Sequence, residues 1–413
     1  MMTVNNTTID NTKVATEGVM QVPSWWTCPP GYEELQAKAH ELGKNELLPR
    51  AAISDQESRY PRESLTKIAE AGFGAATLPT ELGGVGKGLT GFAVLAESFA
   101  QYCASSTMCW VMHTAATQLM YVAGNEEQHK RFIPDVLKGK VGALAFSEPA
   151  TGSHFWNVVS TAPRSGNGYL LNADKSFVTS AGEADWYIVA TTYPESTNDD
   201  KLMFLVTDNN QEGITQYPYN AMGLRGNSSG PMKFRDVYVP AENRLGTEGG
   251  MNFHNDNTLD PLFLLGTAAC WTGIAQGALN AAIDGAKKKV HADTGKSVAG
   301  YQVIRHELAK AQITIDSARA MLYRTAEGLD QAIANGTPLE KCLFPVWQLK
   351  THAADIVIQV TNQALQVSGG RGYLTGQVEK FLRDGRAGAV MGPTNEILRE
   401  WIGKSLIDVP WFE

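Results

Sequence analysis

The apolar periodicity of this sequence changes twice, near Val141 and again near Leu262. Before the first change, from about Tyr32 to Ala123, apolar residues recur at helical spacing. Between the two changes they form short β-branched or aromatic runs, which is the pattern of strands. After Leu262 the helical spacing returns. This order predicts an α+β fold, mainly α, with an N-terminal helical domain, a central antiparallel β domain and a C-terminal four-helix bundle.

The chain has 413 residues, of which 43% are hydrophobic, and this is enough for two or three domains. Residues 1–22 are polar and contain no signal-peptide core, so we expect a disordered tail there. We place the N-terminal helical domain at 23–142, the β domain at 143–245 and the helical bundle at 246–413.

Local signals refine this division. Asn125 is expected to cap a short helix, with Gln128 as its capping-box partner. The turn-forming residues at 172–174 and 208–210 are expected to separate strands. Long amphipathic helices are expected at 306–329 and 345–367. The expected strands are 141–146, 168–171, 177–178, 186–190, 202–206 and 237–239.

The composition excludes several classes of protein. A formal net charge of −8 argues against a nucleic-acid binder, because such proteins are normally basic. The mean hydropathy is −0.21, and we expect no membrane span. The five cysteines have no CxxC spacing, so we expect buried thiols in a reducing cytoplasm and no metal site.

One stretch, residues 144–153, has a composition suited to binding a cofactor. Its apolar run stops at Ser147 and becomes a polar loop that ends in Gly152 and Ser153. Hydroxyls and backbone N–H groups at the mouth of a sheet can hold a polar ring and a phosphate. An ordinary strand-to-turn transition is the alternative for this segment alone.

Further motifs decide between these two interpretations. Nearly the whole chain, from about residue 30 to 405, resembles the acyl-CoA dehydrogenase flavoprotein superfamily in four motifs that occur in the family's order. The matching segments are FSEPATGS at 146–153 ("TEPxAGSD"), GYLLNADKSFVT at 168–179 ("GYxLNGxKxWIT"), MGLRG at 222–226 with FRDVYVPAEN at 234–243 ("MGxRG…FxDVxVPxxN"), and QVSGGRGY at 366–373 leading to Arg383 and Asp384 ("QxxGGxGY…RDxR").

The resemblance implies FAD as the cofactor. In the family, the hydroxyls that match Ser147 and Thr179 hydrogen-bond the flavin ring, and the aromatic residue that matches Phe177 packs beside it. Ser153 would serve the pyrophosphate, as an anion-binding loop should. Two neighbours in the same motifs complete this part of the expected FAD site: Phe146 and Val178.

The resemblance also implies an oligomer. Gly369, Gly370 and Gly372 match positions that contact the FAD of a neighbouring subunit, where glycine lets the backbone approach closely. Gln366, in the same motif, also belongs to the expected FAD site. Thr394 and Glu396 match the family's "TSQ" segment on the adenine and pyrophosphate sides. Because the cofactor spans two chains in this family, we expect a homodimer or homotetramer.

The sequence departs from the family at the catalytic base. The family removes the α-proton of an acyl thioester with a carboxylate, commonly the glutamate of "YEGTSQIxR". In this sequence that position is Gly392, which cannot accept a proton. A minority of members carry the base on the helix before Gly273, and counting back without gaps places Phe263 there. Leu264 then replaces the arginine that serves the CoA side.

Three residues remain as candidates for the base. Asp260, like Asp256, is a carboxylate near Phe263, although Asp260 is equally suited to be a helix N-cap. Glu396 lies four residues after Gly392. His113 matches a helix that lines the acyl pocket in relatives, and a packed or surface histidine is the alternative.

Three classes of function remain open. The first is dehydrogenation of an acyl thioester, bound to CoA or to a carrier protein, with an electron-transfer flavoprotein as partner. The second is a flavin-dependent monooxygenase supplied by a flavin reductase. The third is a non-redox relative or the inactive subunit of a hetero-oligomer. The short C-terminus, which ends at Trp411–Glu413, favours the first class.

Overall fold

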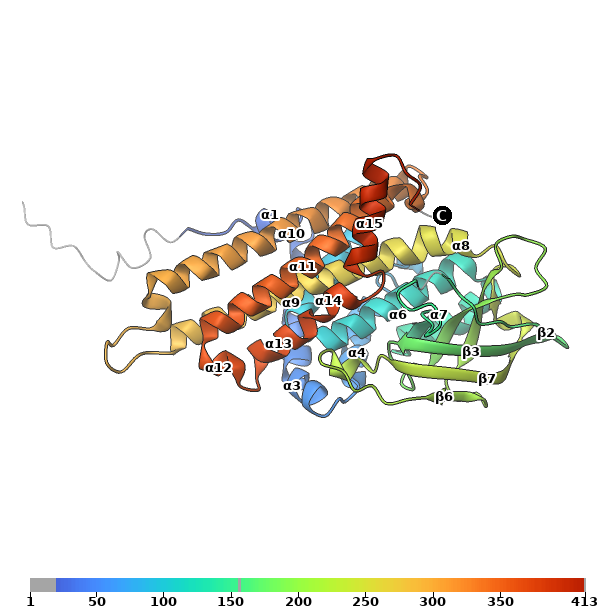
Figure 1. Ribbon diagram of the computed structural model, residues 1–413, viewed down its shortest axis with the longest axis horizontal. Helices are drawn as coiled ribbons and strands as arrows, with labels where there is room; N and C mark the ends of the chain where they lie inside the picture. The colour runs from blue at the N-terminus through green and yellow to red at the C-terminus, as the bar shows by residue number, and fades with distance from the viewer. Residues whose placement is uncertain (1–19, 155–156, 412–413) are drawn as a thin grey trace, which may run out of the picture.

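The computed structural model describes residues 20–154 and 157–411. Two layers of helices lie side by side along the molecule, and a β domain packs at one end of them (Figure 1). Most of the predicted tail, residues 1–19, lies outside the described residues, and Met20–Val22 form no helix or strand. The order helical, β, helical confirms the predicted fold class.

The N-terminal region is helical, as the periodicity predicts. The predicted capping box is present: Asn125 Oδ1 accepts from Gln128 N at 3.0 Å, and Gln128 Oε1 accepts from Asn125 N at 2.9 Å. The helices are α1 (Ser24–Thr27), α2 (Glu33–Leu42), η1 (Gly43–Leu47), α3 (Leu48–Gln56), α4 (Arg62–Ile68), η2 (Ala69–Phe73), η3 (Thr80–Leu82), α5 (Gly88–Ala100), α6 (Ala104–Ala123) and α7 (Glu126–Leu137).

The β domain consists of two four-stranded sheets, with orders β1-β4-β5-β8 and β2-β3-β7-β6. The prediction of a purely antiparallel domain is wrong at one pair, because β1 runs parallel to β4. The intervening residues cross to the other sheet before the chain returns as β4, and this crossover allows the parallel pairing. The strands are β1 (Gly142–Ala145), β2 (Arg164–Ser165), β3 (Gly168–Val178), β4 (Trp186–Thr192), β5 (Leu202–Asp208), β6 (Ile214–Gln216), β7 (Gly230–Pro240) and β8 (Arg244–Leu245).

The turn predicted at 172–174 is also wrong. Strand β3 continues through these residues, with a shift of register between Leu171 and Ala173. Asn172 sits at this irregularity and exchanges two hydrogen bonds of 3.1 Å with Asp236, using its side chain for both. The polar side chain therefore supports a β-bulge instead of ending the strand.

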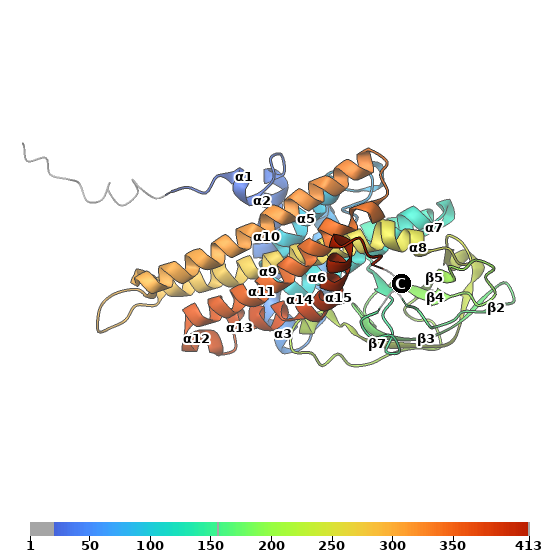
Figure 2. The ribbon, with the colours of Figure 1, turned by 45° about the horizontal axis from the view of Figure 1, so that its top comes forward.

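The C-terminal region contains three long helices that lie side by side, α9, α10 and α11 (Figure 2). The fourth member of the predicted bundle is the short α13, and α5 packs on α9 from the N-terminal domain. The elements are α8 (Asn252–His254), η6 (Asn255–Leu259), α9 (Asp260–Lys288), α10 (Gln302–Ala334), α11 (Leu343–Ser368), α12 (Gly370–Tyr373), α13 (Gln377–Gly385), α14 (Ala387–Val390) and α15 (Asn395–Leu406), with short 3₁₀ turns η4 (Arg225–Asn227), η5 (Ala241–Asn243), η7 (Val298–Gly300) and η8 (Leu339–Cys342).

Helix α9 is the central core helix. A Cβ at Gly273 would lie 2.2 Å from the carbonyl oxygen of Glu97 on α5, so glycine is what permits the close contact of these helices. The helical run Asn252–Lys288 is apolar and long enough to cross a membrane, but 94% of its most apolar window is buried inside the protein. Packing in the core accounts for its composition.

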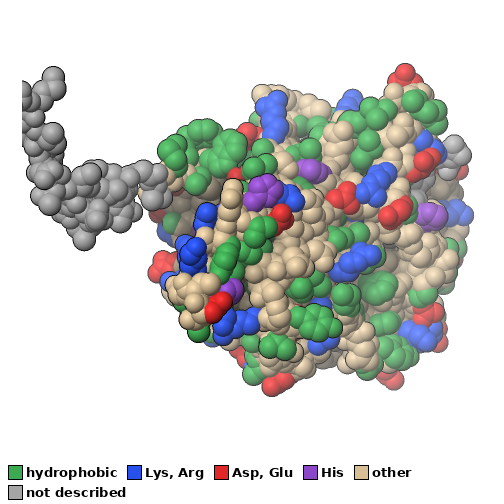
Figure 3. All heavy atoms as spheres, turned by 60° about the vertical axis from the view of Figure 1, so that its left-hand side comes forward, with side chains coloured by type: hydrophobic (Ala, Val, Ile, Leu, Met, Phe, Trp, Pro, Cys, Tyr) green, Lys and Arg blue, Asp and Glu red, His purple; other side chains and the backbone are tan. Residues whose placement is uncertain are grey.

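The surface is mixed in charge. Viewed from the end of the bundle, acidic and basic side chains are interspersed with scattered apolar ones, and neither charge dominates this face (Figure 3). All five cysteines are free thiols, and only Cys342 is more than marginally exposed.

A carboxylate on α10 caps helix α5 and joins the two helical regions. Asp330 accepts hydrogen bonds from Leu89 N at 2.6 Å and from Thr90 N at 2.9 Å. Gly88 precedes them with φ +59°, and a Cβ there would lie 2.5 Å from the carboxylate. The cap thus requires both the carboxylate of Asp330 and a glycine at position 88, where a side chain would collide with that carboxylate.

We expect Asp330→Ala to lower the free energy of unfolding by about 1–2 kcal/mol, because it removes a cap and a negative charge at a helix N-terminus. Chemical denaturation measures this loss. Glu327→Ala removes an exposed carboxylate from the same helix and is the matched control. Equal stability of the two variants would contradict the capping role.

Candidate active site

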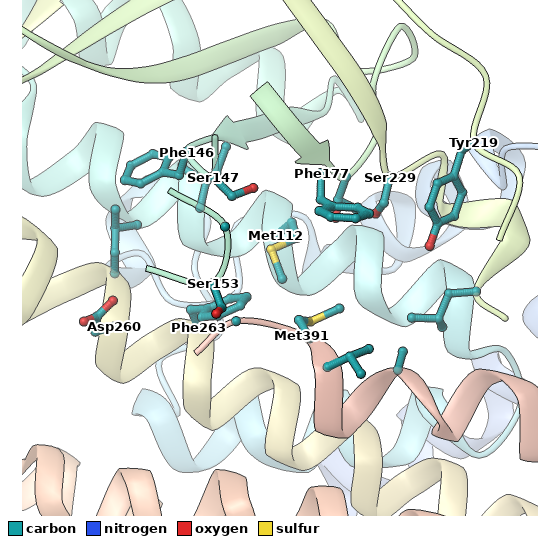
Figure 4. Close-up of a pocket in the computed structure, with 18 of the residues that line it drawn as sticks. Met112, Phe146, Ser147, Ser153, Phe177, Tyr219, Ser229, Asp260, Phe263 and Met391 are labelled. Atoms are coloured by element: carbon teal, nitrogen blue, oxygen red, sulfur yellow. The ribbon is translucent and has the colours of Figure 1, made fainter. Parts of the chain in front are cut away.

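A cavity of about 430 Å³ lies where the β domain meets helices α6 and α9 and the segment after α14 (Figure 4). Hydroxyl-bearing residues line its β-domain side, and apolar residues line most of the helical side. The lining residues are Met112, Leu144, Phe146, Ser147, Gly152, Ser153, Phe177, Thr179, Tyr219, Leu224, Ser229, Asn255, Leu259, Asp260, Phe263, Ala387, Val390, Met391 and Gly392.

The loop after β1 forms one wall. Ser147, Gly152 and Ser153 all line the cavity, as the opening motif predicts for a cofactor loop. Gly152 has φ +59°, a conformation that favours glycine. Phe146 packs against Phe204 of β5, with ring centroids 5.3 Å apart, and this contact fixes the start of the loop.

A buried ion pair holds this loop in place. Lys175 Nζ on β3 lies 2.6 Å from Glu148 Oε1, and both side chains are buried. The same ammonium donates to Phe146 O at 3.1 Å and to Ala190 O on β4 at 2.7 Å. Burial lowers the pKa of Lys175 to about 8, which the ion pair with Glu148 opposes.

The end of β3 supplies the next part of the wall. Thr179 Oγ1 lies 2.9 Å from Ser229 Oγ, and both residues line the cavity. Phe177 also lines it, with 69% of its surface exposed, which is unusual for a phenylalanine. Val178, between them, is buried in the core of the sheet.

The loop that carries the third motif is fixed by α13. Asp384 Oδ1 accepts from Leu224 N at 2.6 Å, and a Cβ at Gly223 would lie 2.1 Å from the carbonyl oxygen of Arg383. Arg383 in turn binds both oxygens of Asp55, at 2.8 and 2.5 Å. Leu224 is thereby held at the cavity by α13, which Asp55 of α3 holds in turn.

The chemistry of this wall fits a flavin. Ser147, Ser153 and the Thr179–Ser229 pair offer hydroxyls to a polar ring system, and Phe177 offers an aromatic face. Thr151 Oγ1, in the same loop, is buried without a hydrogen-bond partner among the described residues. An unsatisfied buried hydroxyl in this loop is consistent with a polar ligand close by.

The remaining predicted cofactor residues lie away from this cavity. Gln366, Gly369 and Gly370 are exposed at the end of α11. Next to them lies a hollow of about 200 Å³. Its lining includes Val367 of α11 and Arg371 of α12, together with residues of α9 and α13. Thr394 precedes α15 and Glu396 lies in its first turn. The assignment of Gly369 and Gly370 to a neighbouring subunit's FAD, and of Gln366, Thr394 and Glu396 to the cofactor, stays a prediction.

His113 is turned into the protein instead of the cavity. Its Nδ1 accepts from Gly142 N at 3.0 Å, and its Nε2 lies 3.0 Å from Gly74 O, to which it donates. Burial lowers the pKa of His113 to about 4, so the ring is neutral at physiological pH. With both nitrogens paired to the backbone, this side chain anchors β1 and is no candidate for the base.

Glu396 is also separated from the cavity. Its side chain is 75% exposed, with Arg399 Nη1 3.8 Å from its carboxylate. His154 is exposed at the end of the cofactor loop. Gly392 does line the cavity, but it has no side chain to accept a proton.

Asp260 is the one carboxyl group that lines the cavity in the described part of the chain. Its alternative role as an N-cap is wrong, because the π-helical segment η6 continues directly into α9. No described protein donor hydrogen-bonds its carboxyl, although protein surrounds it on most sides. Burial, and then repulsion from Asp256, raise the pKa of Asp260 to about 8.

Two residues near Asp260 in the sequence also depart from the family pattern. Phe263, at the expected position of the alternative base, lines the cavity with its ring. Leu264, at the position of the CoA-side arginine, is 1% exposed and lies in the core. Neither residue offers a polar group to a substrate.

Sequence reasoning missed several residues of the site. Met112, Tyr219 and Ser229 line the cavity, and Lys175 with Glu148 holds it together. Glu148 and Lys175 lie inside quoted motifs, so an acid and a base in two adjacent cofactor motifs could have suggested a pair. The other three carry no local signal, because only the fold brings them to the cavity.

Comparisons with known proteins agree with this arrangement. Models of three acyl-CoA dehydrogenase domains match the chain in order: the N-terminal domain at residues 29–140, the middle domain at 143–237 and the C-terminal domain at 265–407. A probable acyl-CoA dehydrogenase of Mycobacterium tuberculosis, FadE25, is 30% identical over 385 residues, which cover 92% of this chain and 96% of that protein.

Two further relatives extend this result. An acyl-CoA dehydrogenase of Bacillus subtilis is 29% identical over 377 residues, covering 90% of this chain and 97% of that protein. The solved structure of butyryl-CoA dehydrogenase from Megasphaera elsdenii superimposes with a TM-score of 0.81 at 26% identity, covering 94% of this chain and all of that one. The chain belongs to the acyl-CoA dehydrogenase family. Members of this family are flavoprotein oxidoreductases that bind FAD.

The buried pair generates a prediction. Lys175→Met leaves Glu148 buried without its cation, and we expect a loss of about 3–5 kcal/mol in the free energy of unfolding. Adding Glu148→Leu should recover much of this loss, because no buried charge then remains. Denaturant titration of the three proteins measures both effects.

The exposed pair Lys130–Glu127 provides the control, since Lys130→Met should change stability little. If Lys175→Met were no more damaging than Lys130→Met, the proposed role of the buried pair would be wrong.

Proposed function

We propose that the protein is an FAD-dependent oxidoreductase that dehydrogenates an acyl thioester between its α and β carbons, with Asp260 as the base. The observation that carries this proposal is the carboxyl of Asp260, which lines a largely apolar cavity without a protein partner. Family membership supports the reaction class. Gly392 at the usual base position requires another proton acceptor.

The cofactor would lie against the β-domain wall. We assign Ser147 and Thr179 to the flavin ring, Phe177 to its edge, and Ser153 to the pyrophosphate, with Phe146 and Val178 supporting them. Bound FAD supplies the acceptor for the hydride that leaves the β carbon. Gly369 and Gly370 would contact the FAD of a neighbouring subunit, which implies a homodimer or homotetramer. Gln366, Thr394 and Glu396 would complete the cofactor site.

Asp260 would take the α-proton. Without a ligand its carboxyl is protonated at neutral pH, since its pKa is about 8. A carboxylate in so apolar a place is a stronger base than one in water, and its pKa lies close to working pH. Apolar residues that line the same cavity, such as Phe263 and Met391, limit solvation of the charge.

The remaining assignments are also proposals. Electrons would leave to an electron-transfer flavoprotein, and the protein would act in the cytoplasm. The tether of the thioester is CoA or a carrier protein. The core position of Leu264 favours the carrier protein, because the CoA-side arginine is missing. A monooxygenase is the second candidate, favoured by Gly392, since that reaction needs no α-proton base.

Anaerobic mixing of the holoenzyme with CoA and carrier-protein thioesters tests the proposal. We expect the oxidised flavin band to bleach, at a rate that rises with pH through about 8 as Asp260 loses its proton. Asp260→Asn should slow bleaching by about 10²–10⁴-fold, the usual contribution of a general base. Asp284→Asn, which removes an exposed carboxylate from the same helix α9, is the matched control.

Two outcomes would contradict the assignment, and a third would correct the placement of Gly392. Equal rates for Asp260→Asn and the wild type would exclude Asp260 as the base. Bleaching by no thioester, together with an oxygenated-flavin spectrum when reduced flavin meets air, would favour the monooxygenase. Failure of Gly392→Glu to restore bleaching to Asp260→Asn would show that the position of Gly392 does not face the substrate.

A second prediction for Asp260 concerns stability. Because folding raises its pKa above the unfolded value, its contribution is fully favourable only at low pH and is lost as pH rises through about 8. We expect Asp260→Asn to have a higher Tm than the wild type, by a margin that grows between pH 5 and 8 and then levels off. A constant margin across this range would show that the carboxyl titrates normally.

A further inference from the structure

One lysine of the helical core is fully buried without an acidic partner. The side chain of Lys350, on α11, is 0% exposed. No carboxylate of the described residues lies within ion-pair distance of its ammonium. The cost of burying an unpaired ammonium is several kcal/mol, so its retention at this position calls for an explanation.

The ammonium binds three oxygens of a single segment. It donates to Met391 O at 3.0 Å, to Pro393 O at 2.8 Å and to Asn395 Oδ1 at 3.1 Å. These contacts use all three of its N–H donors. The two carbonyl groups flank Gly392, and both Met391 and Gly392 line the cavity.

The third contact connects the ammonium to a charge network. The amide of Asn395 donates to Asp355 Oδ1 at 2.9 Å, and Asp355 also pairs with Arg399 at 2.6 Å. Asp355 lies five residues after Lys350 on α11, while Asn395 and Arg399 lie on α15. The network therefore joins the cavity segment to both helices.

The buried position disfavours the positive charge of Lys350. Burial lowers the pKa of Lys350 to about 7, opposed by Glu396 and then Asp355, while Arg399 lowers it further. A methionine has similar length and would avoid this cost, but it would leave the two carbonyls and Asn395 without their donor. Three directed hydrogen bonds are what lysine adds at this position.

We infer that Lys350 is a positioning residue for the reaction, whose ammonium holds the segment 391–395 and so places the Met391–Gly392 wall of the cavity against the substrate. The inference rests on the proposed function for its catalytic consequence. In this family's common arrangement a carboxylate occupies the position of Gly392. Here the wall has no such side chain, and Lys350 holds it through the carbonyl groups on either side of Gly392.

Lys350→Met in the holoenzyme tests this inference. We expect the maximal rate of flavin reduction by a thioester to fall about 10–100-fold, since misplacement near 1 Å costs up to that factor, while the KM changes less than about threefold. Hydrogen exchange of the backbone amides at 391–396 should become faster. The separate variant Lys350→Arg should keep slow exchange and part of the rate, because guanidinium also donates to several oxygens.

Val360→Ala is the matched control, because Val360 is fully buried on the same helix and makes none of these contacts. It should lower the Tm while leaving exchange at 391–396 and the rate unchanged. Unchanged exchange in Lys350→Met would overturn the inference, and so would an equal loss of rate in Val360→Ala. If no thioester reduces the wild-type flavin, the proposed function fails, whereas the exchange comparison still decides whether Lys350 holds the segment.

Discussion

The ion pair between Lys175 and Glu148 is the interaction on which the cavity depends. Lys175 belongs to the sheet of β3 and β7, whereas its acceptor Ala190 belongs to the sheet of β4 and β5. Another partner of Lys175, Glu148, lies in the cofactor loop. One ammonium thus joins both sheets to the loop. Its ion pair and hydrogen bonds offset the desolvation of the two charges only if both sheets and the loop adopt their native positions.

Other walls of the cavity are held in the same way. Arg383 connects α13 to Asp55 of the N-terminal domain, while Asp384 holds Leu224 of the β domain. Lys350 fixes the segment at Gly392 from inside the bundle. Each contact links parts of the chain that are distant in sequence, so the shape of the cavity is a property of the assembled domains and not of any one of them.

This dependence explains how far sequence reasoning could go. Periodicity and four motifs were enough for the order of domains and for the hydroxyl wall at Ser147 and Thr179, because those signals are local. The prediction of a turn at 172–174 was wrong. Asn and Asp favour turns, but here the side chain of Asn172 accepts a hydrogen bond from Asp236 N of the neighbouring strand. The sequence left His113 open as a candidate base or as a packed histidine, because the two backbone groups that bind it lie 29 and 39 residues away.

The contrast between His113 and Asp260 shows what makes a buried titratable group available for chemistry. Both are enclosed, and burial shifts the pKa of each toward its neutral form. The backbone satisfies every polar atom of His113, so releasing it would cost two buried hydrogen bonds. No protein donor satisfies the carboxyl of Asp260, and its free energy therefore depends on what enters the cavity. A group left in this state by the fold can exchange a proton with a ligand without first breaking the structure.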